Sequence, residues 1–187
     1  ECPSCGRSLS PDMKNCPACG NAIIISSFTS VASMPLPTIN KYANAYRNAL
    51  QNNPDDKTLN NAVGMCYLKL KLYDKAIPAF EKAIEDNFDN AETFFYAAVC
   101  LLKGKKAFLA QRPEINKIEN YLNAACMIEP KGVYYLFWAY ITKEYYARKF
   151  LTSSPKSSEL SQLAVDCGCS NFDTEQLFSL LTVESPF

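Results

Sequence analysis

The chain has no histidine, few glycines and no long apolar run, and each of these absences narrows its function. Without an imidazole, a Ser-His-Asp or Cys-His catalytic arrangement is excluded, and so is any zinc site that uses histidine. Six glycines in 187 residues argue against a linker-rich protein. The apolar runs Ala22–Ile25 and Val133–Ile141 are far too short to span a bilayer.

Neither sign of charge is in excess. The 19 Lys and Arg residues balance the 19 Asp and Glu residues. A dedicated nucleic-acid-binding protein usually carries a basic excess, so the balance disfavours that class. The sequence also contains no glycine-rich phosphate loop and no pair of carboxylates in a recognisable catalytic context. We therefore expect a protein that is not an enzyme.

What the chain does contain is nine cysteines, four of which lie close to its start. They form two Cys-Pro-x-Cys-Gly knuckles, made by Cys2, Cys5, Cys16 and Cys19. Two thiolates three residues apart can bind one ion from a tight turn, and the glycine that follows them frees the backbone for positive φ. A segment of about 20 residues has almost no core, so a metal has to contribute its folding free energy, on the order of 10 kcal/mol. We predict one structural Zn²⁺ held by all four thiolates.

The other five cysteines are scattered. Cys66, Cys100 and Cys126 are predicted to be small apolar core residues, and Cys167-Gly168-Cys169 is predicted to end a helix rather than to form a redox or metal pair. One metal site without a disulfide framework favours a reducing compartment, so we expect a cytoplasmic protein. The chain opens with Glu1 rather than Met, and no signal-peptide pattern is visible.

A second pattern covers Gly64–Asn87. Val63, Cys66, Tyr67 and Leu70 share one side of a first helix, a turn follows at Lys71–Tyr73, and the next helix has apolar residues at helical spacing: Ala76, Ile77, Phe80, Ala83 and Ile84. Asp74 is expected to cap the second helix, and Pro78 to lie in its first turn. Related residues recur about 34 positions away: Tyr42, Tyr46 and Ala49 before this stretch, and Ala98 and Leu101 after it.

These two patterns resemble known families. Residues 1–21 resemble the small bacterial zinc ribbon, in which two Cys-Pro-x-Cys-Gly knuckles flank a short loop. The pattern Gly64-x-x-Tyr67 followed by Ala76-x-x-x-Phe80-x-x-Ala83 resembles the tetratricopeptide repeat (TPR), and the resemblance extends over residues 39–145. It implies stacked helix pairs, whose first helices commonly line a peptide-binding groove.

The expected fold class is all-α: a short, irregular TPR-like array with a small N-terminal four-cysteine zinc ribbon. The predicted divisions are a ribbon over 1–21, a linker over 22–38, TPR-like helices over 39–152 and a C-terminal helical hairpin over 153–187 that packs on or caps the array. Within the array we expect one long helix over Val133–Leu151. In the tail we expect helices over Ser157–Cys167 and Thr174–Val183, the latter opened by a capping box at Asp173.

The groove implied by the TPR resemblance would use nine residues: Asn61, Met65, Leu68, Lys69, Phe95, Val99, Lys103, Tyr134 and Phe137. The alternative is that the C-terminal helices fill the groove and that these residues are internal packing. The most basic stretch, Lys103–Lys106 with Arg112, is either a contact for phosphate or an acidic partner, or a solvated loop.

The leading hypothesis for function is a non-enzymatic adaptor or scaffold, of a kind expected in the bacterial cytoplasm. It would bind a protein partner through the TPR-like domain and use the zinc ribbon as a second docking module. One alternative is a nucleic-acid-associated factor that binds through the ribbon, although Arg7 and Lys14 are the only cations there. A second alternative is a structural subunit of a larger assembly.

Overall fold

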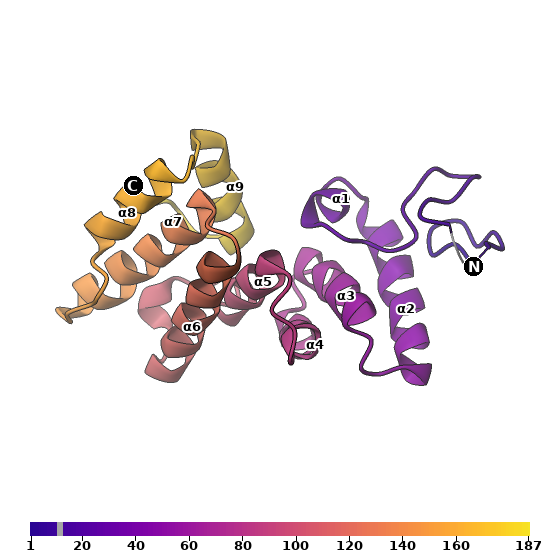
Figure 1. Ribbon diagram of the computed structural model, residues 1–187, viewed down its shortest axis with the longest axis horizontal. Coiled ribbons are helices and arrows are strands. Elements are labelled where there is room, and N and C mark those ends of the chain that lie inside the picture. Colours follow the sequence, from indigo (N-terminus) through magenta and orange to yellow (C-terminus); the bar gives the residue numbers. More distant parts are fainter. Residues whose placement is uncertain (11–12) are drawn as a thin grey trace. The chain divides into compact units, whose positions relative to one another are not determined.

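The computed structural model describes residues 1–10 and 13–187 and divides the chain into two compact units, Glu1–Glu85 and Asp86–Phe187 (Figure 1). Pro11 and Asp12, which belong to the predicted ribbon, lie outside the described residues. The described parts of the chain are helical and contain no β-strand, and a single antiparallel bridge joins Asn15 to Ala22. The predicted all-α class with an N-terminal four-cysteine cluster is confirmed. Over the same residues, no helix combines the length and the apolar character needed to cross a membrane.

The first unit is built around one central helix. Its helices are α1 (Phe28–Ala32), α2 (Leu36–Asn52), α3 (Lys57–Lys69) and α4 (Tyr73–Ile84). Helix α3 packs against α4 and also contacts α2 and α1. For this reason α3 is buried over most of its length, and its buried residues are Asn60, Ala62, Val63, Gly64, Met65, Cys66 and Leu68.

The helix pair predicted for the central stretch is present as α3 and α4. The turn between them has Lys71 in the left-handed region at φ 57°, and the Leu72 N–H closes it by donating to the Tyr67 carbonyl at 2.9 Å. Two local predictions were wrong. Leu72, not Asp74, is the N-cap of α4, because the helix starts two residues earlier than the expected cap requires. For the same reason Pro78 lies in the second turn of α4 rather than in the first.

Residues 22–38 are not the extended tether that their composition suggests. They contain helix α1, and two of their side chains, Ile25 and Val31, are buried in the core. Helix α2 begins at Leu36, inside the predicted linker. Pro37 fits in its first turn, where the missing N–H leaves no helical hydrogen bond unmade.

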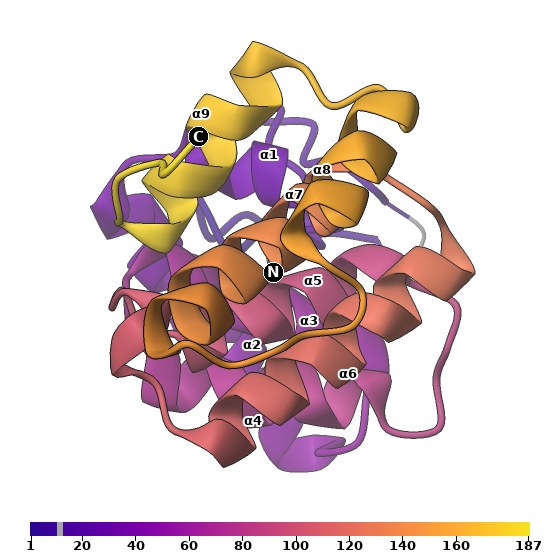
Figure 2. The ribbon, with the colours of Figure 1, turned by 90° about the vertical axis from the view of Figure 1, so that its left-hand side faces the viewer.

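The second unit is organised around α7. Its helical segments are α5 (Ala91–Leu101), η1 (Ala107–Leu109), α6 (Arg112–Ile128), α7 (Gly132–Ile141), η2 (Thr142–Tyr146), η3 (Ala147–Lys149), α8 (Ser157–Asp166) and α9 (Asn171–Leu181). Helix α5 packs against α6, while α7 contacts α6, α8 and α9. Helices α8 and α9 face the viewer in Figure 2. The C-terminal residues thus pack on α7.

The predicted long helix over Val133–Leu151 is one continuous helical run, but it is not a single α-helix. After α7 the run widens to a π-helix over Thr142–Tyr146 and then tightens to a 3₁₀ turn over Ala147–Lys149. At the first of these changes, the buried Thr142 hydroxyl donates to the Ala139 carbonyl at 2.9 Å. A side-chain hydrogen bond to this carbonyl therefore accompanies the change from α-helical to π-helical backbone hydrogen bonding.

The ends of the two tail helices follow from their capping residues. Gly168, at φ 78°, ends α8 as predicted: Cys169 N–H donates to Ala164 O, and Gly168 N–H donates to Val165 O, both at 2.9 Å. The start of α9 was predicted three residues too late. Ser170 is the N-cap, and the Asp173 carboxylate accepts from the Ser170 N–H at 2.9 Å as the second member of the capping box.

Two glycines allow helices to approach closely, and they predict different costs of substitution. A Cβ on Gly132 would lie 2.5 Å from the Ala164 carbonyl oxygen, which is backbone and cannot move aside. A Cβ on Gly64 would meet the ring of Phe80 at 2.8 Å, and a ring can tilt. We expect Gly132→Ala to lower the free energy of unfolding by about 2 kcal/mol or more, and Gly64→Ala to cost less, because overpacking is worst where nothing can give. Urea unfolding of both variants measures the difference, and equal midpoints would contradict it.

Candidate metal centre

The two cysteine knuckles fold in the same way. In the first, Cys2 N–H donates to the Arg7 carbonyl at 2.8 Å, and Gly6 N–H donates to the Cys2 carbonyl at 2.9 Å. In the second, the equivalent bonds run from Cys16 to Asn21 and from Gly20 to Cys16, both at 2.8 Å. Gly6 and Gly20 have φ of 77° and 73°, which other L-residues rarely adopt. Each knuckle is therefore a closed turn that points two sulfurs the same way.

The four sulfurs meet at one point. Every pair among Cys2, Cys5, Cys16 and Cys19 lies within 4.8 Å, with Cys2 Sγ 3.7 Å from Cys19 Sγ and Cys5 Sγ 3.6 Å from Cys16 Sγ. In a tetrahedral site with metal–sulfur bonds of about 2.3 Å, neighbouring sulfurs lie about 3.8 Å apart. A disulfide would bring two sulfurs to about 2.05 Å. The spacing fits four ligands around one metal ion and does not fit disulfides.

The electrostatics of the cluster also favour a cation. Backbone N–H groups of Cys19 and Ala18 hydrogen-bond to the Cys16 sulfur, and with the neighbouring thiols they lower the pKa of Cys16 to about 6. For Cys5 the Arg7 backbone hydrogen bond acts in the same direction. Loss of hydration and side-chain hydrogen bonds to the other three cysteines outweigh it and raise the pKa of Cys5 to about 11. A metal ion binds all four sulfurs as thiolates, so its binding displaces the protons of the thiols.

Two tyrosines of α2 attach the segment after the ribbon to the helices. The Tyr46 hydroxyl accepts from the Ile25 N–H at 3.0 Å and donates to the Ile23 carbonyl at 2.8 Å, while Tyr42 donates to the Ala22 carbonyl. Burial, followed by the nearby Cys2, Cys19 and Cys16, raises the pKa of Tyr42 to about 12. Sequence reasoning assigned these tyrosines to the repeat pattern and missed their bonds to the segment, because their partners are backbone atoms about 20 residues away.

The nine residues expected to line a groove are mostly inside the units. Six have exposed fractions of 5% or less: Met65, Leu68, Phe95, Val99, Tyr134 and Phe137. In the first unit Asn61 is half-buried, and Lys69 donates to the Ala32 carbonyl at 2.7 Å. In the second unit the Phe95 ring packs 5.0 Å from the ring of Tyr134 and 6.0 Å from that of Phe137, while Lys103 is exposed. This burial corresponds to the alternative of internal packing.

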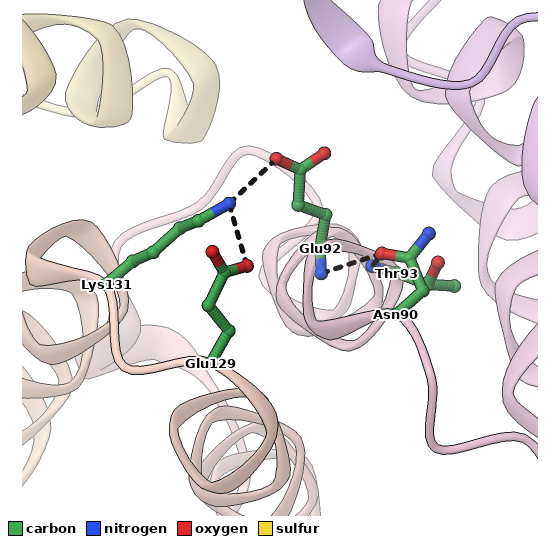
Figure 3. Close-up of polar contacts among 5 residues, drawn as sticks. All are labelled: Asn90, Glu92, Thr93, Glu129 and Lys131. Atoms are coloured by element: carbon green, nitrogen blue, oxygen red, sulfur yellow. Dashed lines mark hydrogen bonds and ion pairs between the residues drawn. The ribbon is translucent and has the colours of Figure 1, made fainter.

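A cluster of charged side chains joins α5 to the residues just before α7 (Figure 3). Lys131, just before α7, reaches Glu92 of α5 at 3.2 Å and Glu129 at 3.1 Å. Asn90 caps α5 by accepting from the Glu92 N–H at 3.0 Å. The Lys131 ammonium is also 6.0 Å from the Tyr134 ring centroid, and the hydroxyl of that tyrosine is buried without a hydrogen-bond partner. The cluster ties the start of α5 to the α6–α7 connection, which is a structural role.

An open groove does exist in the first unit, between α2, α3 and α4. Its volume is about 310 Å³, and its lining residues are Arg47, Leu50, Gln51, Pro54, Asn60, Val63, Tyr67, Pro78, Ala79 and Lys82. Sequence reasoning did not find this groove. Hydrophobic periodicity shows which side of each helix is buried, but it does not show where three helices leave a gap.

The remaining cysteines do not add to the metal centre. Cys66 and Cys100 are fully buried, as predicted for core residues, and burial raises the pKa of the Cys66 thiol to about 12. Cys126, Cys167 and Cys169 are half-buried. Among the described residues, the four N-terminal cysteines are the group placed to hold a metal ion. Comparison with protein-family models, curated proteins and solved structures gave no match.

The geometry predicts one metal ion per chain and its loss on removal of any of the four thiols. Cys16→Ser is expected to abolish stoichiometric binding, because three thiolates leave the site open, while Cys167→Ser keeps it. Metal content after purification and competition with a chromogenic chelator measure both. Affinity should fall as pH is lowered, since protons compete for the same sulfurs. Binding that survives Cys16→Ser unchanged would refute the four-thiolate site.

The hydrogen bonds of Tyr42 and Tyr46 predict an effect on stability that does not depend on the metal ion. Tyr46→Phe leaves the buried Ile25 N–H and the Ile23 carbonyl without their partner, and we expect a loss of about 1–3 kcal/mol in stability. Tyr42→Phe removes a single donor and is expected to cost less. Limited proteolysis should show faster cleavage within residues 22–34 in Tyr46→Phe than in Tyr42→Phe. The reverse order would contradict the assignment of Tyr46 as the main anchor.

Proposed function

We propose that the chain is a non-enzymatic adaptor that binds an acidic segment of a partner protein in the groove between α2, α3 and α4, with a zinc-loaded ribbon as a second docking module. The groove is the observation that carries this proposal. It is open to solvent and lies on the packed helices of the first unit, so its shape is preformed.

The lining of the groove supports an extended peptide as its occupant. Leu50, Val63, Pro78 and Ala79 supply apolar walls for alternate side chains of such a segment. Arg47 and Lys82 add two cations, and no described residue of the lining carries a carboxylate. Lys82 lies 3.5 Å from Asp55, whose side chain is 89% exposed. An exposed pair of this kind is weak, and a carboxylate of the partner can replace Asp55.

The resemblance to TPR proteins is a second support. The helix pairs α3/α4 and α5/α6 have the order and the close contacts that the repeat pattern implies. The binding surface proposed here differs from the one expected from the sequence, because most of those residues are occupied in internal packing. The groove uses instead the outward side chains of α2 and α4, together with one side of α3.

We propose Zn²⁺ as the metal of the ribbon. Four thiolates in tetrahedral spacing are a donor set that zinc and iron share, and a short segment without a core is typical of structural zinc sites. The metal would hold the two knuckles together and so provide a second docking surface. Elemental analysis of protein purified without added metal separates zinc from iron, and bound iron would overturn this assignment.

A peptide-selection experiment tests the groove. The full chain is presented to a random peptide library, and enriched peptides are expected to combine Asp or Glu with apolar residues. The double variant Arg47→Glu/Lys82→Glu should weaken binding of these peptides by more than about tenfold, since both charges change sign. Lys117→Glu, a reversal on α6 in the other unit, is the matched control and should bind as wild type. Failure to enrich acidic peptides, or equal binding by the double variant, would overturn the proposal.

A further inference from the structure

A bulky apolar residue occupies an exposed left-handed position at the end of the helical run of the second unit. Phe150 has φ 57° and ψ 31°, and its side chain is 97% exposed. Phe150 N–H donates to the Ala147 carbonyl at 3.1 Å, and Leu151 N–H donates to the Tyr146 carbonyl at 2.9 Å, as in a helix end that usually has glycine at this place. The other non-glycine residues with positive φ in the described chain are polar: Lys71, Asp86, Lys103 and Thr182.

Neither local conformation nor packing accounts for this phenylalanine. Glycine would relieve the backbone strain, and a polar residue would be better hydrated. Because almost the whole ring is in contact with solvent, it contributes little to the core. A residue that is unfavourable on both counts is typical of a functional surface.

Cations held on aromatic rings lie next to Phe150. The Arg148 guanidinium is 4.8 Å from the Phe108 ring centroid, and the Lys149 ammonium is 5.2 Å from that ring and 4.0 Å from the Tyr145 ring. Because Phe108 belongs to the short helix η1 and both cations contact its ring, the two cations lie beside η1. These contacts place the end of the helical run and the α5–α6 connection at one edge of the unit.

The α5–α6 connection adds exposed lysines and an exposed apolar side chain to this region. Lys105 and Lys106 are exposed just before η1, and the Leu109 side chain on η1 is 66% exposed. Lys103, Lys105, Lys106 and Leu109 also line a small pocket of about 150 Å³. We call Lys105, Lys106, Leu109, Arg148, Lys149 and Phe150 the basic tip.

Charge is distributed unevenly over the second unit. Residues 103–112 and 143–149 hold seven cations and one carboxylate, Glu144, which pairs with Arg148 at 2.9 Å. The residues after Lys156 hold five carboxylates and no cation. Of these five, Asp166 and Asp173 flank the α8–α9 connection, whereas Glu159 lies at the start of α8, where its carboxylate accepts from the Lys156 N–H at 3.0 Å. The unit has a basic end with protruding apolar side chains.

We propose that the basic tip binds the surface of an anionic phospholipid bilayer, with Phe150 inserted at the level of the headgroups and the four cations next to lipid phosphates. Protruding apolar side chains surrounded by cations match a soft, negatively charged surface. A protein partner would require a complementary pocket for Phe150, and single-stranded nucleic acid would favour an open aromatic platform, whereas the rings of Phe108 and Tyr145 are covered by cations.

Vesicle sedimentation with the full chain tests the proposal. We expect binding to vesicles of equal parts phosphatidylglycerol and phosphatidylcholine, and none to phosphatidylcholine alone. Lys105→Glu/Lys106→Glu should weaken binding by more than about tenfold, and Phe150→Ala by about fivefold or more. Phe172→Ala is the matched control, since Phe172 is 67% exposed on α9 and lies away from the basic tip. No binding to the anionic vesicles, or an equal loss with Phe172→Ala, would overturn the proposal.

Two further variants separate insertion from a structural role. Phe150→Trp should show fluorescence quenching by brominated acyl chains, measured against wild type as the background for Trp138. Phe150→Gly should raise the melting temperature by about 2–4 °C, because strain is removed, while vesicle binding falls. If Phe150→Gly binds vesicles as wild type does, or if Phe150→Ala leaves binding intact while the lysine reversals abolish it, the surface is a general polyanion site and the proposal fails.

Discussion

The fold of the two cysteine knuckles depends on the cluster of their four sulfurs, because the described residues around them have almost no apolar core. Each knuckle is closed by two backbone hydrogen bonds and a glycine in the left-handed region. Those local bonds fix the direction of the cysteines, but they do not hold the two knuckles together. The four-cysteine cluster joins the knuckles, and so does a hydrogen bond that the Asn21 amide donates to the Ser4 hydroxyl at 2.9 Å. The helices that follow then hold the exit of the segment through Tyr42 and Tyr46.

The local parts of this architecture were predictable from the sequence. Cysteine spacing identifies the knuckles, since a Cys-x-x-Cys turn and its glycine are determined within five residues. Periodicity identifies α3 and α4 because their apolar residues recur at helical spacing over several turns. Gly168 and the polar residues at the start of α9 mark helix ends, although the choice between Ser170 and Asp173 as the cap depends on which backbone groups each reaches.

The parts that were not predictable depend on contacts between distant residues. Residues 22–38 have the composition of a linker, yet Ile25 and Val31 are buried because α2 and α3 lie beside them. Phe95, Tyr134 and Phe137 have the spacing of an exposed helix face in a repeat array, and the structure packs them against one another. The exposure of a helix face is decided by its neighbours, and periodicity does not identify those neighbours.

Helix α2 contributes to two surfaces of the first unit, and a rotation of the helix about its own axis would affect both. Tyr46 points to the backbone of Ile23 and Ile25, while Arg47, the next residue, lines the groove with Leu50 and Gln51. Successive residues of an α-helix are separated by about 100° around its axis, so the two surfaces are different sides of one rigid rod. The helix is held to residues 22–25 on one side and lines the groove on the other. A turn of the rod that improved the fit of one side would misalign the other, so the two surfaces constrain each other's evolution.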